Sequence, residues 1–231
     1  MNDIDLQPTL HTPLLDLRPL RAADWGALFA VASDPLVWAV HPAHDRWQEP
    51  VFRKFFEQGL ASGGALVVTA PGTGEIIGYS RYDRTRAGPD EVEIGWTFLA
   101  RAYWGGAPNR AMKRAMLTHA LQFVPRVIFI VGAENHRSRR AMEKIGGRLE
   151  ERPISTAASL PQGPHVTYVI DRESFAAGPL MQAEASAPPA GVIDVPFRES
   201  LAERAALSSG QTTRAVPRMP DTIPLYDTTR T

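Results

Sequence analysis

Apolar residues recur along the chain with two different periods, and their order predicts a sheet with helices packed against it. Strand-like runs, either alternating or continuously apolar, cover residues 14–18, 65–69, 76–82, 91–98, 127–131, 148–152 and 166–170. Helical spacing of apolar residues marks residues 24–33, 50–62, 111–124 and 138–145. We therefore predict an α/β fold, with a mixed, mostly antiparallel sheet of six to seven strands flanked by about four helices.

Two segments indicate how this core is expected to pack. The helix at 50–62 should bury one stripe of apolar residues, formed by Val51, Phe52, Phe55, Phe56 and Leu60. The run 127–131 has no polar alternation, so we expect a strand in the sheet interior with both faces covered. The part of the chain with intervening helices is expected to contain a parallel pair, because an intervening helix permits a parallel crossover.

Composition divides the chain into three parts. Residues 1–13 have mixed polarity and two prolines, which predicts a flexible N-terminal arm. Residues 14–175 carry the predicted strands and helices and form one domain. Residues 176–231 are rich in alanine, proline and serine and lack the apolar density that offsets ordering entropy. We predict a mostly disordered tail there, with one short helix at 198–207.

Charge and cysteine content narrow the class of protein. Lys+Arg and Asp+Glu number 25 each, so no net field favours nucleic acid or an anionic membrane as a partner. No apolar run approaches the ~20 residues of a membrane span, and the acidic N-terminus does not fit a signal peptide. The sequence contains no cysteine, which excludes disulfides, cysteine-ligated zinc and a thiol nucleophile. We expect a cytoplasmic protein.

A glycine-containing turn precedes the helix that begins near Asn109. Small residues at Gly105, Gly106 and Ala107 let backbone N–H groups face outward, and a helix N-terminus favours an anion such as a pyrophosphate. Arg110 and Lys113 follow in the first turns and could reach the same phosphates. The alternative is a tight turn in which the glycines are needed only because a side chain would not fit. The spacing is neither GxGxxG nor GxxxxGK[ST], so it does not favour a Rossmann or P-loop site.

Three segments together carry a family resemblance. Residues 93–96 read E-I-G-W, residues 103–107 read Y-W-G-G-A, and residues 135–146 read N-H-R-S-R-R-A-M-E-K-I-G. They resemble the E-I-G-Y/W strand, the Y-W-G-x-G loop and the N-x-x-S-x-x-x-L-E-K-x-G segment of GNAT (GCN5-related) N-acetyltransferases. The branch is that of the ribosomal-protein-alanine N-acetyltransferases, and the resemblance spans about residues 14–172.

The loop departs from the family pattern at four positions. Ala107 replaces its second glycine, Pro108 stands where an aromatic residue is usual, and Asn109-Arg110 replaces the common A-T-E.

The resemblance implies an N-acyltransferase that uses acetyl-CoA as co-substrate. The acetyl group would pass to an amine by direct attack on the thioester, and the acceptor would be a protein N-terminus or a small-molecule amine. Homodimers are common among the relatives. The cofactor-binding residues that the resemblance implies are Trp104, Gly105, Gly106, Ala107, Asn109, Arg110, Asn135 and Ser138.

The resemblance also implies catalytic roles for Glu93 and Ser138. Family members often use the carboxylate matching Glu93 as a general base, directly or through water, because an amine of pKa about 10 must lose a proton before it attacks. The alternative for Glu93 is a solvated or ion-paired carboxylate at an edge. Ser138 would lie near the thioester sulfur, and Asn135 would bind the pantetheine arm or the reacting groups. Helix capping is the alternative for both.

The segment between the first two helices contains His41, His44 and Arg46. In this fold the region commonly flanks the acceptor pocket, whereas an aromatic-rich loop packed over the sheet is the alternative. The sequence positions no further ligand beside the two histidines, so we predict no metal site.

Two other functions stay open at this point. One is a non-catalytic CoA-binding or partner-binding module with a GNAT fold, which the variant loop at Pro108 favours. The other is an interaction protein whose function resides in the tail.

Overall fold

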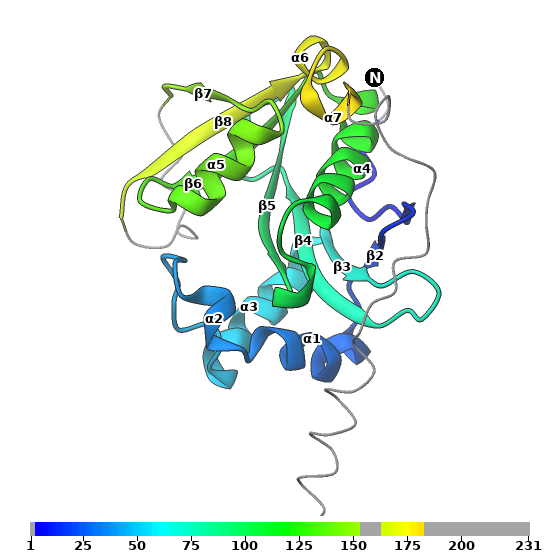
Figure 1. Cartoon of the computed structure of the whole chain (residues 1–231), viewed down its shortest axis with the longest axis vertical. Coiled ribbons are helices and arrows are strands. Elements are labelled where there is room, and N and C mark those ends of the chain that lie inside the picture. The colour runs from blue at the N-terminus through cyan, green and yellow to red at the C-terminus, as the bar shows by residue number, and fades with distance from the viewer. Residues whose placement is uncertain (1–2, 153–162, 183–231) are drawn as a thin grey trace, which may run out of the picture. The chain divides into compact units, whose positions relative to one another are not determined.

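The structure is a computed structural model, and it describes residues 3–152 and 163–182. An eight-stranded sheet, with strand order β1-β2-β3-β4-β5-β6-β8-β7, carries helices on both faces (Figure 1). The strands are β1 (Leu10–His11), β2 (Asp16–Pro19), β3 (Ala65–Thr69), β4 (Ile76–Asp83), β5 (Glu91–Leu99), β6 (Arg126–Gly132), β7 (Arg148–Glu150) and β8 (His165–Asp171). The helices are α1 (Trp25–Ala32), α2 (Pro35–Trp38), α3 (Glu49–Ser62), α4 (Ala107–Phe123), α5 (His136–Lys144), α6 (Arg172–Ala176) and α7 (Pro179–Gln182), with short 3₁₀ turns at Ala22–Asp24 and Arg101–Tyr103.

The predicted fold class is confirmed, with one strand more than expected. Neighbouring strands are antiparallel except β5 and β6, so the parallel pair predicted for the helix-bearing part is present, and α4 makes its crossover. The additional strand is β1, in which Leu10 pairs with Leu17 of β2. The helices α1, α3, α4 and α5 match the four predicted ones, whereas the short α2, α6 and α7 are absent from the prediction. The helix expected at 198–207 lies outside the described residues.

Side chains of β3 alternate between two cores, which identifies the two faces of the sheet. Leu66 and Val68 pack into the core that α4 covers. Ala65 and Val67 pack into the core that α1 and α3 cover. This second core contains a group that we call the aromatic cluster, formed by Trp25, Phe29, Trp38, Phe52, Phe55, Phe56, Tyr79 and Phe98.

The stripe predicted on α3 is right for its three phenylalanines and wrong for Leu60. Leu60 is 38% exposed, and Gly59 takes the buried position instead. The hydroxyl of Tyr79 packs so closely over Gly59 that a Cβ at that position would lie 2.7 Å from it. The buried face of α3 therefore depends on a residue without a side chain, which apolar periodicity does not detect.

The parallel strands β5 and β6 pair only over their first three residues. Glu91–Glu93 pairs with Arg126–Ile128, after which β5 remains paired with β4, and β6 with β8. Near this point Trp96 has φ +54°, a conformation that residues with a side chain rarely adopt. The strands consequently separate toward their C-terminal ends.

This separation corrects one expectation for the run 127–131. Its first three residues are buried on both faces as predicted, but Ile130 and Val131 are only partly buried. Both line a cavity between the separated strands. The apolar run is therefore part sheet interior and part cavity wall.

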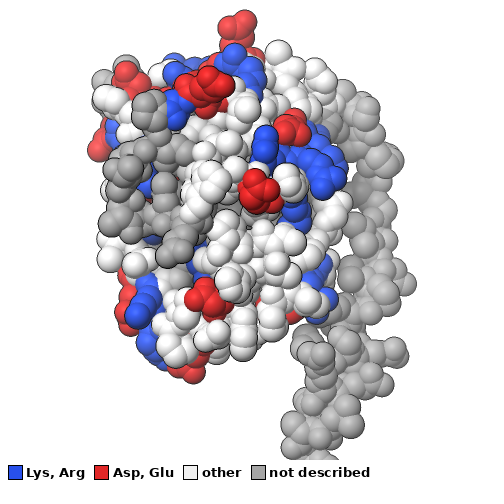
Figure 2. All heavy atoms as spheres, turned by 90° about the vertical axis from the view of Figure 1, so that its left-hand side faces the viewer, with Lys and Arg blue, Asp and Glu red and all other residues white. Residues whose placement is uncertain are grey.

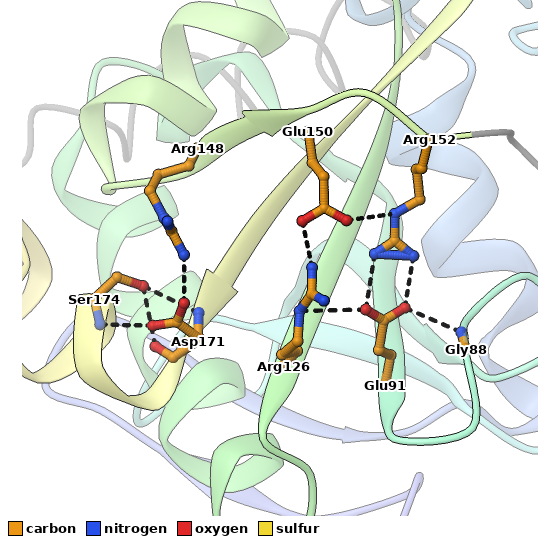
Figure 3. Close-up of polar contacts among 8 residues, drawn as sticks. All are labelled: Gly88, Glu91, Arg126, Arg148, Glu150, Arg152, Asp171 and Ser174. Atoms are coloured by element: carbon orange, nitrogen blue, oxygen red, sulfur yellow. Dashed lines mark hydrogen bonds and ion pairs between the residues drawn. The ribbon is translucent and has the colours of Figure 1, made fainter.

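An ion-pair network, which we call the base network, holds the paired end of β5 and β6 (Figure 3). Both oxygens of Glu91 accept hydrogen bonds of 2.7 Å from Arg152, and one also accepts from the amide of Gly88 at 3.0 Å. Arg126 of β6 lies 3.4 Å from Glu91 and also binds Glu150 of β7. The network thus joins β5, β6 and the edge strand.

The longest described helix, α4, has 17 residues. None of the helices in the described ranges combines the length and the hydropathy of a membrane span.

Candidate functional site

A cavity of about 690 Å³ opens where β5 and β6 separate. Its walls come from these two strands, the loop before α4, the first turns of α4, α5, and α2 with the loop that follows it. Among the residues predicted for the site, those that line the cavity are Glu93, Trp104, Gly105, Gly106, Asn109, Arg110, Asn135 and Ser138. Ala107, the first residue of α4, is not part of the lining.

The loop before α4 presents backbone amides that have no internal acceptor. Gly105 and Gly106 have φ of +101° and +121°, which glycine adopts without strain, and a Cβ at either residue would meet no atom within 4 Å. The amides of Gly105, Gly106, Ala107 and Asn109 donate no hydrogen bond to any described residue. Pro108 has no N–H to offer. The loop therefore leaves donors available at the N-terminus of a 17-residue helix, where an anion is favoured.

The side chain of Trp104 forms the edge of this loop. Its indole Nε1–H donates to the carbonyl of Leu99 at 2.9 Å. The guanidinium of Arg137, on α5, stacks over the indole ring at 4.4 Å and donates to the carbonyl of Val37 on α2 at 3.4 Å. Arg137 thus connects three walls of the cavity.

The two cations that follow the loop point in different directions. Arg110 donates to the carbonyls of Pro179 at 2.9 Å and Lys144 at 3.5 Å. Lys113 does not extend toward the loop as expected, because its Nζ is buried and donates to Thr97 Oγ1 of β5 at 2.7 Å. Burial lowers the pKa of Lys113 to about 7, an effect that the nearby charge of Glu93 opposes. Lys113 is therefore a buried group of the cavity floor.

Glu93 is the one carboxylate among the described residues that line the cavity, and it is fully buried (0% exposed). Arg86, from the loop between β4 and β5, donates to it twice, from Nε at 2.9 Å and from Nη2 at 2.5 Å. Arg86 in turn stacks on Trp96 at 4.3 Å. Burial raises the pKa of Glu93 to about 7, although the charge of Arg86 opposes the shift. A carboxylate with such a pKa can exchange protons at neutral pH.

Asn135 and Ser138 lie where β6 ends and α5 begins. The side-chain oxygen Oδ1 of Asn135 accepts the amide of Ser138 at 3.1 Å, so Asn135 caps the helix. The Ser138 hydroxyl forms no hydrogen bond with any described residue, and it belongs to the cavity lining. The capping alternative therefore describes Asn135, while the Ser138 side chain is available to a ligand.

Comparison with known proteins identifies the family. Residues 15–148, more than half of the chain, match the acetyltransferase (GNAT) domain. The chain belongs to the GNAT acetyltransferase family. No curated protein sequence matches it.

Solved GNAT structures share the fold over most of their length. A GCN5-related N-acetyltransferase from Brucella melitensis has 19% identity and a TM-score of 0.63, with 79% of this chain and 86% of that chain covered. RimJ from Mycobacterium smegmatis, solved with CoA-disulfide, has 19% identity and a TM-score of 0.57, with 77% of this chain and 92% of that chain covered. Spermidine N-acetyltransferase from Vibrio cholerae, solved with CoA and spermine, has 13% identity and a TM-score of 0.54, covering 71% and 99%.

The segment after α2 forms the far end of the GNAT cavity. His41 and Arg46 line the cavity, whereas His44 is exposed and does not. Arg46 stacks over Phe55 at 4.7 Å and over Trp38 at 5.5 Å, so the packed aromatic-rich loop considered from the sequence is present. No group of three or more metal-ligating side chains occurs within residues 3–152 and 163–182.

Sequence reasoning missed Arg86 and Arg137. Arg86 lies in a stretch that the sequence shows only as a polar loop, and its pairing with Glu93 arises because the β4–β5 hairpin folds back. Arg137 occupies a variable position of the N-x-x-S segment, so the motif does not select it. Helical periodicity could have indicated burial of Lys113, since it falls next to Met112 and one turn before Met116 and Leu117.

Proposed function

We propose that this GNAT protein transfers an acetyl group from acetyl-CoA to a primary amine, by direct attack of the amine on the thioester. The observation that carries the proposal is the set of amides at Gly105, Gly106, Ala107 and Asn109, which lack an internal acceptor at the mouth of the cavity. Such a helix N-terminus suits the diphosphate of CoA. Open space around both glycines leaves room for it.

The charge of the cavity near this loop fits the same ligand. Arg110, Arg140 and Lys144 line the cavity beside the start of α4 and on α5. Phosphate groups are recognised by such clusters of cations together with backbone amides. The CoA ligands of the RimJ and spermidine N-acetyltransferase structures support this choice of co-substrate.

Acetyl-CoA supplies the activated acetyl group, and residues of this chain would direct the proton and the charge. Glu93 takes a proton from the acceptor amine, directly or through water, for which a pKa of about 7 is suited. Backbone N–H groups of the separated strand β5 polarise the thioester carbonyl. Ser138 contacts the thioester end, and Asn135 holds the start of α5 in position while contacting the pantetheine arm. The sequence contains no cysteine, which agrees with a mechanism without a thiol acyl-enzyme.

For the acceptor we propose a protein N-terminus or a small-molecule amine. The sequence resemblance to ribosomal-protein-alanine N-acetyltransferases favours a protein N-terminus, and one structural neighbour is a spermidine N-acetyltransferase, which favours a small-molecule amine. The absence of cysteine also fits a reducing cytoplasm as the site of action.

Calorimetric titration of the full chain with acetyl-CoA tests the first half of the proposal. Saturable binding is expected, and coupled measurement of CoA release with a panel of amines tests the second half. No binding at millimolar acetyl-CoA would overturn the proposal, because enzymes typically have KM values of about 1 μM–1 mM for their substrates.

One observation favours a second candidate, a CoA-binding module without turnover. Arg86 occupies both oxygens of Glu93, and a base held in this way must release or share a hydrogen bond before it accepts a proton. Such a module would bind acetyl-CoA but release no CoA with any amine. Substitution of Glu93 distinguishes the two, because a module has no rate to lose.

A further inference from the structure

The cavity contains far more positive than negative charge. Among the described residues that line it, Glu93 is the one carboxylate, and Arg86 already neutralises it. The lining cations number seven: Arg46, Arg86, Arg110, Lys113, Arg137, Arg140 and Lys144. A cavity of this kind attracts anions and repels cationic ligands.

Four of these cations lie at two different ends of the cavity. Arg110, Arg140 and Lys144 lie on α4 and α5 beside the loop that we assign to the diphosphate. Arg46 lies in the segment between α2 and α3, against the aromatic cluster. The phosphates of CoA account for the first group and leave Arg46 unexplained.

Arg46 has donors but no internal acceptor. Its guanidinium stacks over Phe55 and Trp38, and it forms no hydrogen bond or ion pair with any described residue. A guanidinium carries five N–H donors, and those of Arg46 are left to solvent or to a ligand in the cavity. Burial lowers the pKa of Arg46 to about 10, so it remains charged at neutral pH.

His41 adds a donor beside Arg46. Its Nδ1 accepts the amide of Ala43 at 2.9 Å, which places the proton of the neutral ring on Nε2. Burial, with the charges of Arg46 and Arg137, lowers the pKa of His41 to about 3, so the ring is neutral near pH 7. No described residue accepts from Nε2. Two adjacent side chains therefore present unused donors to the cavity.

The geometry points to an acceptor that carries a carboxylate as well as its amine, with the carboxylate bound by Arg46 and His41. This inference rests on the proposed acetyl transfer. The fork of a guanidinium matches a carboxylate in a bidentate manner. Trp38 and Phe98 line the same end and favour an apolar side chain on the acceptor, so a hydrophobic amino acid fits this end better than a polyamine.

The positive excess does not extend over the face seen in Figure 2. There, residues of both signs are interspersed around a broad uncharged area, and neither sign forms a continuous patch. On this face, therefore, surface charge does not favour an anionic ligand, whereas the cations that line the cavity do.

The test compares matched amines at saturating acetyl-CoA. We expect kcat/KM for phenylalanine to exceed that for phenylalanine amide, phenethylamine and spermidine. In Arg46→Gln the value for phenylalanine should fall about 10- to 100-fold, the loss of a hydrogen-bonded charged partner. The values for the amide and for phenethylamine should change little. Binding of phenylalanine and its amide to the CoA-saturated protein is measured in parallel, so that a poor acceptor still reports on Arg46.

Arg53→Gln provides the matched control. Arg53 stacks on Trp25 of the same aromatic cluster at 4.1 Å but does not line the cavity, so this variant should behave like the wild type. An equal loss in both variants would overturn the inference.

The remaining outcomes separate the inference from the proposed function. A weaker affinity of Arg46→Gln for acetyl-CoA itself would assign Arg46 to the CoA phosphates and overturn the inference. The inference would also be overturned if the wild-type protein used or bound the amide or spermidine at least as well as phenylalanine. The proposed acetyl transfer would stand in that case. Failure to bind acetyl-CoA at all would overturn the proposed function instead.

Discussion

Glu91 and Glu93 lie two residues apart on β5. Glu91 lies at the end where β5 pairs with β6, and Glu93 lies where the two strands begin to separate. Glu91 belongs to the base network, where Arg152, Arg126 and the amide of Gly88 surround it. Glu93 is the last residue of β5 that pairs with β6, and it has Arg86 as its one ion-pair partner among the described residues. The paired end is thus cross-linked by charge (Figure 3). The separated end, in contrast, opens into the cavity.

The difference shows how two strands of one sheet can stay paired at one end and separate at the other. Three elements converge on Glu91 and fix the parallel pairing, so the strands can separate beyond it without unravelling. Burial raises the pKa of Glu93, at the point of separation, and the charge of Arg86 offsets this shift only in part. We infer that Glu91 stabilises the fold and that Glu93 acts in catalysis.

Exchanging each carboxylate for its amide is the strongest way to break this comparison. Glu93→Gln should lower kcat about 10²- to 10⁴-fold, the contribution of a general base, with the affinity for acetyl-CoA unchanged. Steady-state CoA release and calorimetry measure the two quantities. A Glu93→Gln protein with wild-type kcat would contradict the assignment.

Glu91→Gln is the matched variant on the same strand. It should leave kcat nearly unchanged and lower the free energy of unfolding by about 1–3 kcal/mol, because the partly buried guanidinium groups of Arg126 and Arg152 lose a charged acceptor. Urea denaturation measures the loss. Equal effects of both variants on kcat would show that the two ends do not differ in function.

The pH dependence of kcat/KM sharpens the same contrast. A base with pKa about 7 is active when deprotonated, so the rate should rise with pH and level off above 7, with roughly a tenfold loss for each pH unit below that value. The groups that face Glu93 are Arg86, Asp83 and Arg81 from the β4 side and Lys113 from α4. The inflection should vanish in Glu93→Gln, and its persistence there would assign it to another group.

Gly106→Val tests whether the loop before α4, at the separated end of the strands, binds acetyl-CoA. A β-branched side chain at φ +121° is strained by roughly 1–3 kcal/mol and projects into the space we assign to the diphosphate. We expect an affinity for acetyl-CoA at least about tenfold weaker. Gly72→Val, at φ +79° in the β3–β4 hairpin, carries a similar strain away from the cavity and should leave the affinity unchanged.

The smallest expected effect separates the two roles of Asn135. Asn135→Asp keeps the helix cap, whereas Asn135→Ala loses it and should cost about 0.5–2 kcal/mol of unfolding free energy. If Asn135 also contacts the pantetheine arm, both variants will weaken acetyl-CoA binding in calorimetry. Weakening in the alanine variant alone would leave capping as its one role.

Local patterns predicted most of this fold because its strands and long helices carry uninterrupted periodicity. The run 127–131 and the stripe on α3 show where that logic stops. A residue that faces a cavity, such as Ile130, looks like a core residue, and a buried Gly59 leaves no apolar signal. The strand β1 has only two residues, too few to show the alternation of apolar and polar residues that predicts a strand.

The candidate site was predictable in its motifs and not in its electrostatics. Residues 93–96, 103–107 and 135–146 are each local in sequence, and the fold brings them to one cavity. The pairing of Glu93 with Arg86, and the isolation of Arg46, depend on how separate loops fold over the sheet. Contacts of that kind have no signature in a single sequence.

Hydrogen exchange of the amides of Gly105, Gly106, Ala107 and Asn109, with and without acetyl-CoA, tests the central claim most directly. The claim predicts fast exchange in the free protein, because these amides lack internal acceptors, and strong protection once acetyl-CoA is bound. Unchanged exchange in this segment at saturating acetyl-CoA would contradict it.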